Sequence, residues 1–148
     1  MNEIEFKLQQ SLRNVTANLK PGAGSGIMYK ELSYAIGGAV IQVHKHLGPG
    51  QPESVYERAL AKELGYQGIA HECQVPITAH YKGDPVGEFF ADIVVEKRVI
   101  LELKSVAKLL PVHRMQVLSY LRATRMRLGL LINFNTPVVW REIRRVVL

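Results

Sequence analysis

Apolar residues recur at three- and four-residue steps in three stretches of this chain, which is the spacing of an amphipathic helix. The first stretch covers residues 29–47 and ends at a Gly-Pro-Gly turn, and the second covers residues 52–64 and ends at Gly65 and Gly68. The third covers residues 111–125. The pattern therefore predicts three helices, each with one apolar stripe facing a core.

The third predicted helix has an apolar stripe that we expect to face inward. Side chains three and four residues apart lie on the same side of a helix. On this spacing the inward residues are Val112, Met115 and Leu118, together with Leu121 or Val117.

Shorter stretches with the alternation and turn signals of β-strands lie between the second and third helices and after the third. Residues 73–81, 86–95 and 99–104 predict a three-stranded meander. Residues 128–134 predict a further strand, and residues 138–147 either a last strand or a short helix. The predicted fold class is α/β, with the order ααβββαβ and a tail.

The beginning of the chain differs from the rest. Residues 3–19 predict a weak helix, and the PGAGSG run that follows predicts a flexible connection, since Gly and Pro interrupt regular structure. Clear periodicity begins at Met28. We therefore divide the chain into an N-terminal extension, residues 1–27, and one domain, residues 28–148, which is an ordinary size for a single domain.

Composition indicates a folded globular domain. Hydrophobic residues make up 47% and charged residues 22%, which excludes the signature of a disordered chain. Apolar runs are far shorter than the roughly 20 residues of a membrane-spanning helix, and the first residues lack the apolar block of a secretory signal. We therefore predict a cytoplasmic protein without a membrane partner. The single cysteine, Cys73, excludes an internal disulfide and is expected to be a small buried hydrophobic residue.

The net charge of +6 is unevenly distributed along the chain. Residues 28–96 carry −4, whereas residues 97–148 carry +9. Seven arginines of this basic segment are candidates for a phosphate-binding surface: Arg114, Arg122, Arg125, Arg127, Arg141, Arg144 and Arg145. Arginines gathered on one face bind the phosphate backbone of nucleic acids, and the alternative is a solvated surface with scattered charges.

The second hairpin of the meander carries the chemistry. If its turn is centred on Lys97, antiparallel pairing places Asp92 opposite Glu102. Lys104 then shares their face, because side chains alternate along a strand. Two carboxylates opposite each other on a sheet repel, so the pair calls for a cation.

Mg²⁺ suits this arrangement, because it prefers oxygen ligands and is often held by one or two carboxylates with water and substrate phosphate. Asp92, Glu102 and a backbone carbonyl near Leu103 would account for one metal ion. A bound metal lowers the pKa of an attacking water, and Lys104 can position that water or stabilise developing negative charge. Taken alone, a D-x9-E-x-K string more often consists of three ordinary solvated residues on the outer face of a sheet.

The wider sequence resembles a known family. ADIVVEKRVILELK is similar to the D…ExK signature of the PD-(D/E)xK nucleases, with Ala91 in the place of the nominal proline. GPGQPESVYERAL matches the motif of the GxxExxY family at Gly50, Glu53 and Tyr56, and VHKHLGPG, QVPITAHYKG, LLPVH and LGLLINF also resemble that family. The resemblance covers residues 29–147 and implies a restriction-endonuclease-like core, a mixed β-sheet flanked by helices.

The resemblance also implies roles for residues on the first two helices. Related nucleases use an acid from a helix before the sheet to support the metal site, which implies this role for Glu53, although a helix-start acid also suits the helix dipole alone. RecB-like relatives use a helix histidine as a metal ligand, which implies His44, although a lone histidine is more often structural. Tyr56 is expected to be a core aromatic residue.

On the third helix, Gln116 and Tyr120 resemble the Q-x-x-x-Y motif of RecB-like nucleases, which implies contact with substrate phosphate or with Lys104. Their four-residue spacing puts them on one face, and the alternative is a polar and an aromatic residue at the helix boundary. Arg114 and Met115 depart from the acidic and small residues expected there, and Arg114 is expected to strengthen backbone binding.

The sequence thus predicts a metal-dependent nuclease that uses Mg²⁺, or Mn²⁺, and acts on DNA. Its predicted catalytic residues are Asp92, Glu102, Lys104, Glu53 and Gln116. Its predicted metal ligands are Asp92, Glu102, Glu53, His44 and Leu103, and its substrate-binding residues are Gln116, Tyr120 and Arg114. The alternatives are a nucleic-acid-binding or regulatory domain on the same fold with little or no cleavage, and an unrelated interaction module. The pattern leaves open one or two metals, endonuclease or exonuclease action, and a homodimer.

Overall fold

The computed structural model describes residues 29–148, so the predicted extension and the helix predicted at residues 3–19 lie outside the described residues. The elements are α2 (Lys30–Leu47), α3 (Glu53–Tyr66), β1 (His71–Tyr81), β2 (Asp84–Val95), β3 (Val99–Lys104), α4 (Pro111–Thr124), β4 (Leu128–Asn133), the 3-10 helix η1 (Val139–Glu142) and β5 (Ile143–Val147). This order confirms the predicted ααβββαβ. The tail contains both of the predicted alternatives, a short helix and then a strand.

The five strands form one mixed sheet in the order β1-β2-β3-β4-β5. Strands β1, β2 and β3 are antiparallel neighbours, as the predicted meander requires. Strand β4 lies parallel to β3, and β5 is antiparallel to β4. The parallel pair needs a crossover, because its strands start at the same edge of the sheet, and α4 supplies it.

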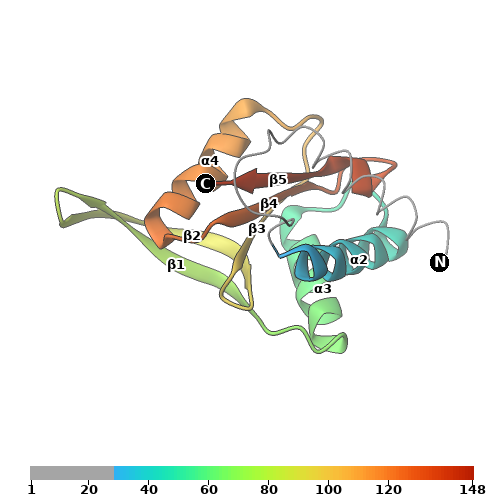
Figure 1. Cartoon of the computed structure of the whole chain (residues 1–148). Helices are drawn as coiled ribbons and strands as arrows, with labels where there is room; N and C mark the ends of the chain where they lie inside the picture. The colour runs from blue at the N-terminus through green and yellow to red at the C-terminus, as the bar shows by residue number, and fades with distance from the viewer. Residues whose placement is uncertain (1–28) are drawn as a thin grey trace.

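Helices cover both faces of the sheet (Figure 1), with α4 on one side and α2 and α3 on the other. The cores divide in the same way. One apolar cluster joins α2 and α3 to the alternate β3 residues Val99, Leu101 and Leu103. A second cluster joins Val117 and Leu121 of α4 to the residues of the opposite sheet face, such as Ile100 and Leu131. The sheet is therefore buried on both faces at β3 and β4, and a polar residue there requires an explanation.

The inward face of α4 differs from the prediction. Val112 and Met115 are 60% and 64% exposed. Leu118 is partly buried and packs against the second cluster, as predicted. The helix buries Val117, Tyr120 and Leu121, so both residues offered as alternatives face the core. The physical reason is Gly129 in β4, where a Cβ atom would come within 2.4 Å of Val117 Cγ1. The missing side chain makes room for Val117, so the buried stripe runs through Val117 and Leu121 and leaves Val112 and Met115 exposed.

The remaining features of the fold are the turn between α2 and α3, the end of α3 and the edge strand β1. Between α2 and α3 the backbone takes positive φ at Gly48 (66°) and Gly50 (95°), which favours glycine. Helix α3 continues through Gly65 to Tyr66, two residues past the predicted end. Cys73, predicted to be buried, is exposed on β1, because this edge strand pairs only with β2. Among residues 29–148, no helix is long and apolar enough to cross a membrane.

Candidate active site

Asp92 marks the point where β2 leaves the regular ladder with β3. The backbone pairs run from Val95↔Val99 through Val94↔Ile100 to Ile93↔Leu101. This register is the predicted one, and it places Asp92 and Glu102 next in line. At this point the Asp92 carboxylate, in place of a backbone carbonyl of β2, accepts the hydrogen bond from β3: Leu103 N donates to Asp92 Oδ2 at 2.8 Å. The carboxylate is thus fixed at the opening between the two strands.

Glu102 is the second carboxylate and one of the few buried polar residues of the described chain, at 4% exposure. Lys104 Nζ lies 3.7 Å from Glu102 Oε1. Glu102 Oε2 is buried and, while both carboxyl groups are ionised, has no hydrogen-bond donor within the described part of the chain. A hydrogen bond joins Glu102 to Asp92 only when one of the two carboxyl groups holds a proton. An unpartnered carboxylate oxygen in a protein interior is costly. It therefore points to a group that binds there.

Electrostatics describe the same site. Burial, followed by the charge of Asp92, raises the pKa of Glu102 to about 8, while Lys104 opposes the rise. Burial also raises the pKa of Asp92 above its ordinary value, against the hydrogen bond from Leu103. Two close carboxyl groups with raised pKa values hold a proton at neutral pH unless a cation replaces it.

Helix α3 brings Glu53 to this site. The helix starts at Glu53, and Ser105 N donates to Glu53 Oε1 at 3.3 Å. The charge of Glu53 contributes to the raised pKa values of both Asp92 and Glu102. The acid that the sequence placed at a helix start therefore lies close to the carboxylate pair.

Helix α4 brings Gln116 and Tyr120 from the other side. Gln116 Nε2 donates to the Tyr120 hydroxyl at 2.7 Å, so the two share a face as predicted. The Tyr120 ring stacks on Phe89 with ring centroids 4.6 Å apart. Burial and then the charge of Glu102 raise the pKa of Tyr120. Its hydroxyl therefore lies in the electrostatic field of the carboxylates.

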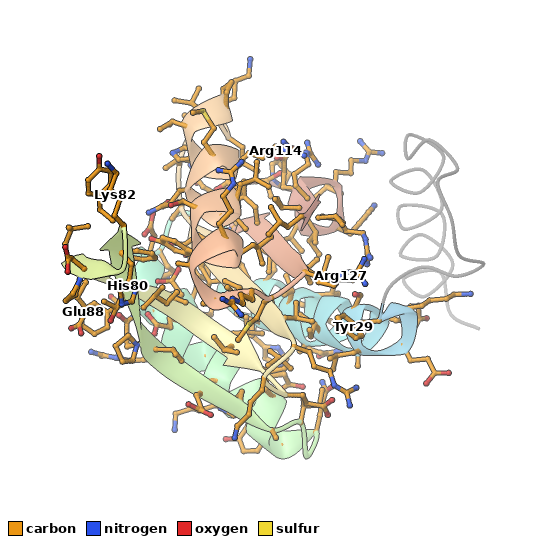
Figure 2. The ribbon with its side chains drawn as sticks, turned by 60° about the vertical axis from the view of Figure 1, so that its left-hand side comes forward. Tyr29, His80, Lys82, Glu88, Arg114 and Arg127 are labelled. Carbon is orange, nitrogen blue, oxygen red and sulfur yellow. The ribbon has the colours of Figure 1, made fainter. Side chains whose placement is uncertain are left out.

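His44 and Arg114 are not joined to this group by the contacts of the described residues. His44 Nε2 lies 2.6 Å from the carbonyl oxygen of Thr136, to which it donates. Arg114 is exposed on α4 (Figure 2), well apart from the tip of the β1–β2 hairpin marked by Lys82. Arg145, one of the arginines predicted to bind phosphate, is only partly exposed, and its Nη1 donates to Ser33 Oγ at 3.0 Å. The ligand role of His44 and the substrate role of Arg114 stay predictions.

Leu103 contributes its backbone alone, because its side chain is buried in the core on the side of α2 and α3. Its N–H points to Asp92. Within a strand, the N–H and C=O of one residue point to the same neighbour, so the Leu103 carbonyl faces the same opening. In the described range 29–148, no three His, Cys, Asp or Glu side chains are gathered as a metal cage. The oxygen atoms at this opening are therefore those of the Asp92 and Glu102 carboxylates and, by strand geometry, the Leu103 carbonyl.

Sequence reasoning missed residues that hold the site in place. Asn133 is buried at the end of β4, and its side chain accepts from Val106 N at 3.1 Å and donates to Val106 O at 2.9 Å. It thereby fixes the segment that follows Lys104. The available signal was a polar residue ending the apolar run LGLLIN. Gln74 donates to both carboxylate oxygens of Glu57 at 2.9 and 3.0 Å, and no local pattern indicates this pair.

Comparison with known proteins adds a family. A model of the PD-(D/E)XK nuclease superfamily matches residues 30–146. That match concerns the superfamily, so the narrower GxxExxY resemblance stays a prediction. Curated proteins gave no match. A solved structure titled "Crystal structure of SSO0001" is 17% identical, with a TM-score of 0.49 over 99% of this chain and 78% of its own. That likeness is too weak to carry an argument.

Proposed function

Because this chain belongs to the PD-(D/E)XK nuclease superfamily, we propose that it hydrolyses phosphodiester bonds in DNA with the help of Mg²⁺ or Mn²⁺. The observation that carries the proposal is the buried, unpartnered Glu102 Oε2 beside Asp92 and Lys104. If the Lys104–Glu102 ion pair were the only purpose of this carboxylate, we would expect both of its oxygens to have partners. A divalent cation would give that oxygen its ligand.

The residues present fit such a cation. Asp92, Glu102 and the Leu103 carbonyl would hold it, and all three offer oxygen. Mg²⁺ keeps several waters and seldom relies on a full protein cage, so a set of two carboxylates suffices without a third acidic side chain. When bound, the metal would polarise the scissile phosphate and lower the pKa of a coordinated water.

The other side chains have roles set by their positions. Lys104, paired with Glu102 at 3.7 Å, orients the attacking water or stabilises the charge that develops on the phosphate. Glu53 supports the metal site from α3. Gln116 and Tyr120 hold the substrate phosphate from α4, with Arg114 adding charge for the backbone. Each carries out positioning or electrostatic work, which is the protein's main contribution to phosphate chemistry.

The decisive experiment is cleavage of labelled single-stranded, double-stranded and branched DNA, and of matching RNA, with Mg²⁺, Mn²⁺ or EDTA. Wild type is compared with Asp92→Ala and Lys104→Ala, and Lys62→Ala on the exposed side of α3 serves as the matched control. We expect metal-dependent cleavage by wild type and Lys62→Ala, and a loss of at least about 100-fold in the other two. Equal activity in all four proteins, with folding matched by circular dichroism, would refute the site.

A nucleic-acid-binding domain without cleavage is the second candidate, and the exposed arginines favour it. Arg122, Arg125, Arg127, Arg141 and Arg144 are all exposed. They supply the charge for phosphate contacts with or without catalysis. In the same assay, this candidate predicts salt-sensitive binding that EDTA leaves unchanged and no cleavage by any variant. The cytoplasmic location and the homodimer remain further predictions.

A further inference from the structure

The turn between α2 and α3 is held by the hydroxyl group of Tyr56. That hydroxyl donates to Gly48 O at 2.5 Å and accepts from Gln51 N at 3.1 Å. Tyr56 is 0% exposed, and its ring stacks on Phe134 with centroids 4.3 Å apart and planes 7° apart. The ring is therefore a core residue, as predicted. The hydroxyl, in contrast, serves only the backbone of one turn.

This turn is connected to the end of β3 by two further hydrogen bonds. Ser105 Oγ donates to Gln51 O at 2.7 Å. Ser105 N donates to Glu53 Oε1 at 3.3 Å. Ser105 directly follows Lys104 and lies more than fifty positions from the turn in sequence. A continuous path thus runs from Tyr56 through Gln51 and Ser105 to Glu53.

We propose that the Tyr56 hydroxyl is a positioning group for the active site, which fixes the 48–52 turn so that Gln51 and Glu53 together clamp Ser105. The inference rests on the proposed nuclease function. It explains the spacing of Gly50, Glu53 and Tyr56. Gly50 permits the positive φ of the 48–52 turn. Glu53 reaches the site, and Tyr56, three residues later on the same side of the helix, holds the 48–52 turn in place. Tyr56 touches neither substrate nor metal.

Substitution by phenylalanine isolates the hydroxyl, because it keeps the ring on Phe134. Without the hydroxyl, Gln51 N and Gly48 O lose their partner, and the turn is free to relax away from Ser105. Tyr66→Phe is the matched control, since Tyr66 lies on the same helix and is 80% exposed. Outer residues that orient a metal site typically contribute about 10- to 100-fold to activity or metal affinity. We expect Tyr56→Phe to lower kcat about tenfold with KM for DNA little changed.

The second readout is independent of cleavage. In ¹H–¹⁵N spectra without metal, the Ser105 amide signal should move in Tyr56→Phe toward its position in Glu53→Gln, and should stay in place in Tyr66→Phe. Titration with Mn²⁺ should show weaker binding by Tyr56→Phe than by wild type. A merely structural role for the hydroxyl would lower the Tm and leave the Ser105 amide, the Mn²⁺ affinity and kcat unchanged.

Ser105→Ala provides a double-mutant test of the path. This variant removes the bond to Gln51 O and leaves the Ser105 backbone N–H in place. If the path is real, the loss of kcat in Tyr56→Phe/Ser105→Ala will be clearly smaller than the product of the two single losses. Multiplicative losses, or an unmoved Ser105 amide in an active Tyr56→Phe enzyme, overturn the inference. An inert wild type would instead overturn the proposed function, together with the catalytic part of this inference.

Discussion

Strands β3 and β4 lie side by side in the same sheet, and on one face they differ in kind at a single pair of buried residues, Glu102 and Leu131. On the face toward α4 their paired residues are Ile100↔Gly129, Glu102↔Leu131 and Lys104↔Asn133. Leu131 is 2% exposed and Glu102 is 4% exposed. The β4 side shows that this layer accepts an aliphatic residue. The carboxylate on β3 is therefore a cost to folding that packing does not require.

This difference between Glu102 and Leu131 shows a position where the residue that would best stabilise the fold is not the residue present. A core leucine gains free energy from burial, whereas a buried carboxyl must hold a proton or find a cation. Lys104 compensates one oxygen of Glu102 and leaves the other without a partner. Replacing Glu102 should thus make β3 more like β4, with higher stability and lost chemistry.

The largest expected effect is on cleavage by Glu102→Gln. The amide keeps the shape of the side chain but removes a charge that the metal needs, so we expect cleavage to fall on the order of 10³-fold. The measurement is single-turnover cleavage in Mg²⁺, with Glu142→Gln on η1 as the control. A Glu102→Gln variant that cleaves like wild type would break the comparison, because Glu102 would then be only a poorly placed core residue.

The next effect is the pH dependence of stability without metal. The pKa of Glu102 is about 8 in the folded protein, against an ordinary value of 4.5. Between these values the folded state holds a proton that the unfolded state has released, so the free energy of unfolding falls as pH rises. The fall ends above about pH 8, when both states are ionised. Over this window we expect a Glu102-dependent loss of roughly 2–4 kcal/mol.

Urea denaturation in EDTA at pH 5, 7 and 8.5 measures this loss. The fall should be smaller in Glu102→Gln, which has no carboxyl to ionise at that position. Mg²⁺ should stabilise wild type more at pH 8.5 than at pH 5, because binding displaces the proton and metal affinity then rises with pH. Parallel stability curves for wild type and Glu102→Gln would show that Glu102 ionises freely and needs no cation.

The features that the sequence predicted well are local. The register of the β2–β3 hairpin follows from its turn and the two-residue period of strands, and it correctly put Asp92 in line with Glu102. The four-residue spacing of Gln116 and Tyr120 correctly put them on one helix face. The superfamily resemblance was confirmed over nearly the whole described chain.

The features that the sequence did not predict depend on contacts between distant segments. Helix α4 offers two apolar stripes, and only its packing over Gly129 selects the one with Val117. The clamp between Gln51 and Ser105 joins residues 54 positions apart. Cysteine is a residue type that is usually buried, but Cys73 lies on an edge strand and is exposed. Periodicity describes one element at a time and does not tell which neighbour will cover it.

The smallest expected effect concerns the first pair of the comparison, Ile100 and Gly129. A Cβ atom at Gly129 would come within 2.4 Å of Val117 Cγ1. The branched side chain of Val117 is fully buried in the middle of α4 and has little room to move. We expect Gly129→Ala to lower the free energy of unfolding by roughly 1–3 kcal/mol, the usual cost of overpacking. Thermal and urea denaturation measure it.

Gly38→Ala on α2 provides a control of opposite sign. A Cβ there meets nothing within 4 Å, and alanine favours a helix over glycine by up to about 1 kcal/mol. Val117→Ala should relieve the strain in Gly129→Ala, so that the double variant is more stable than the sum of the single losses predicts. Additive losses would mean that Val117 does not select the face of α4, and that the seating of Gln116 and Tyr120 beside Glu102 has another cause.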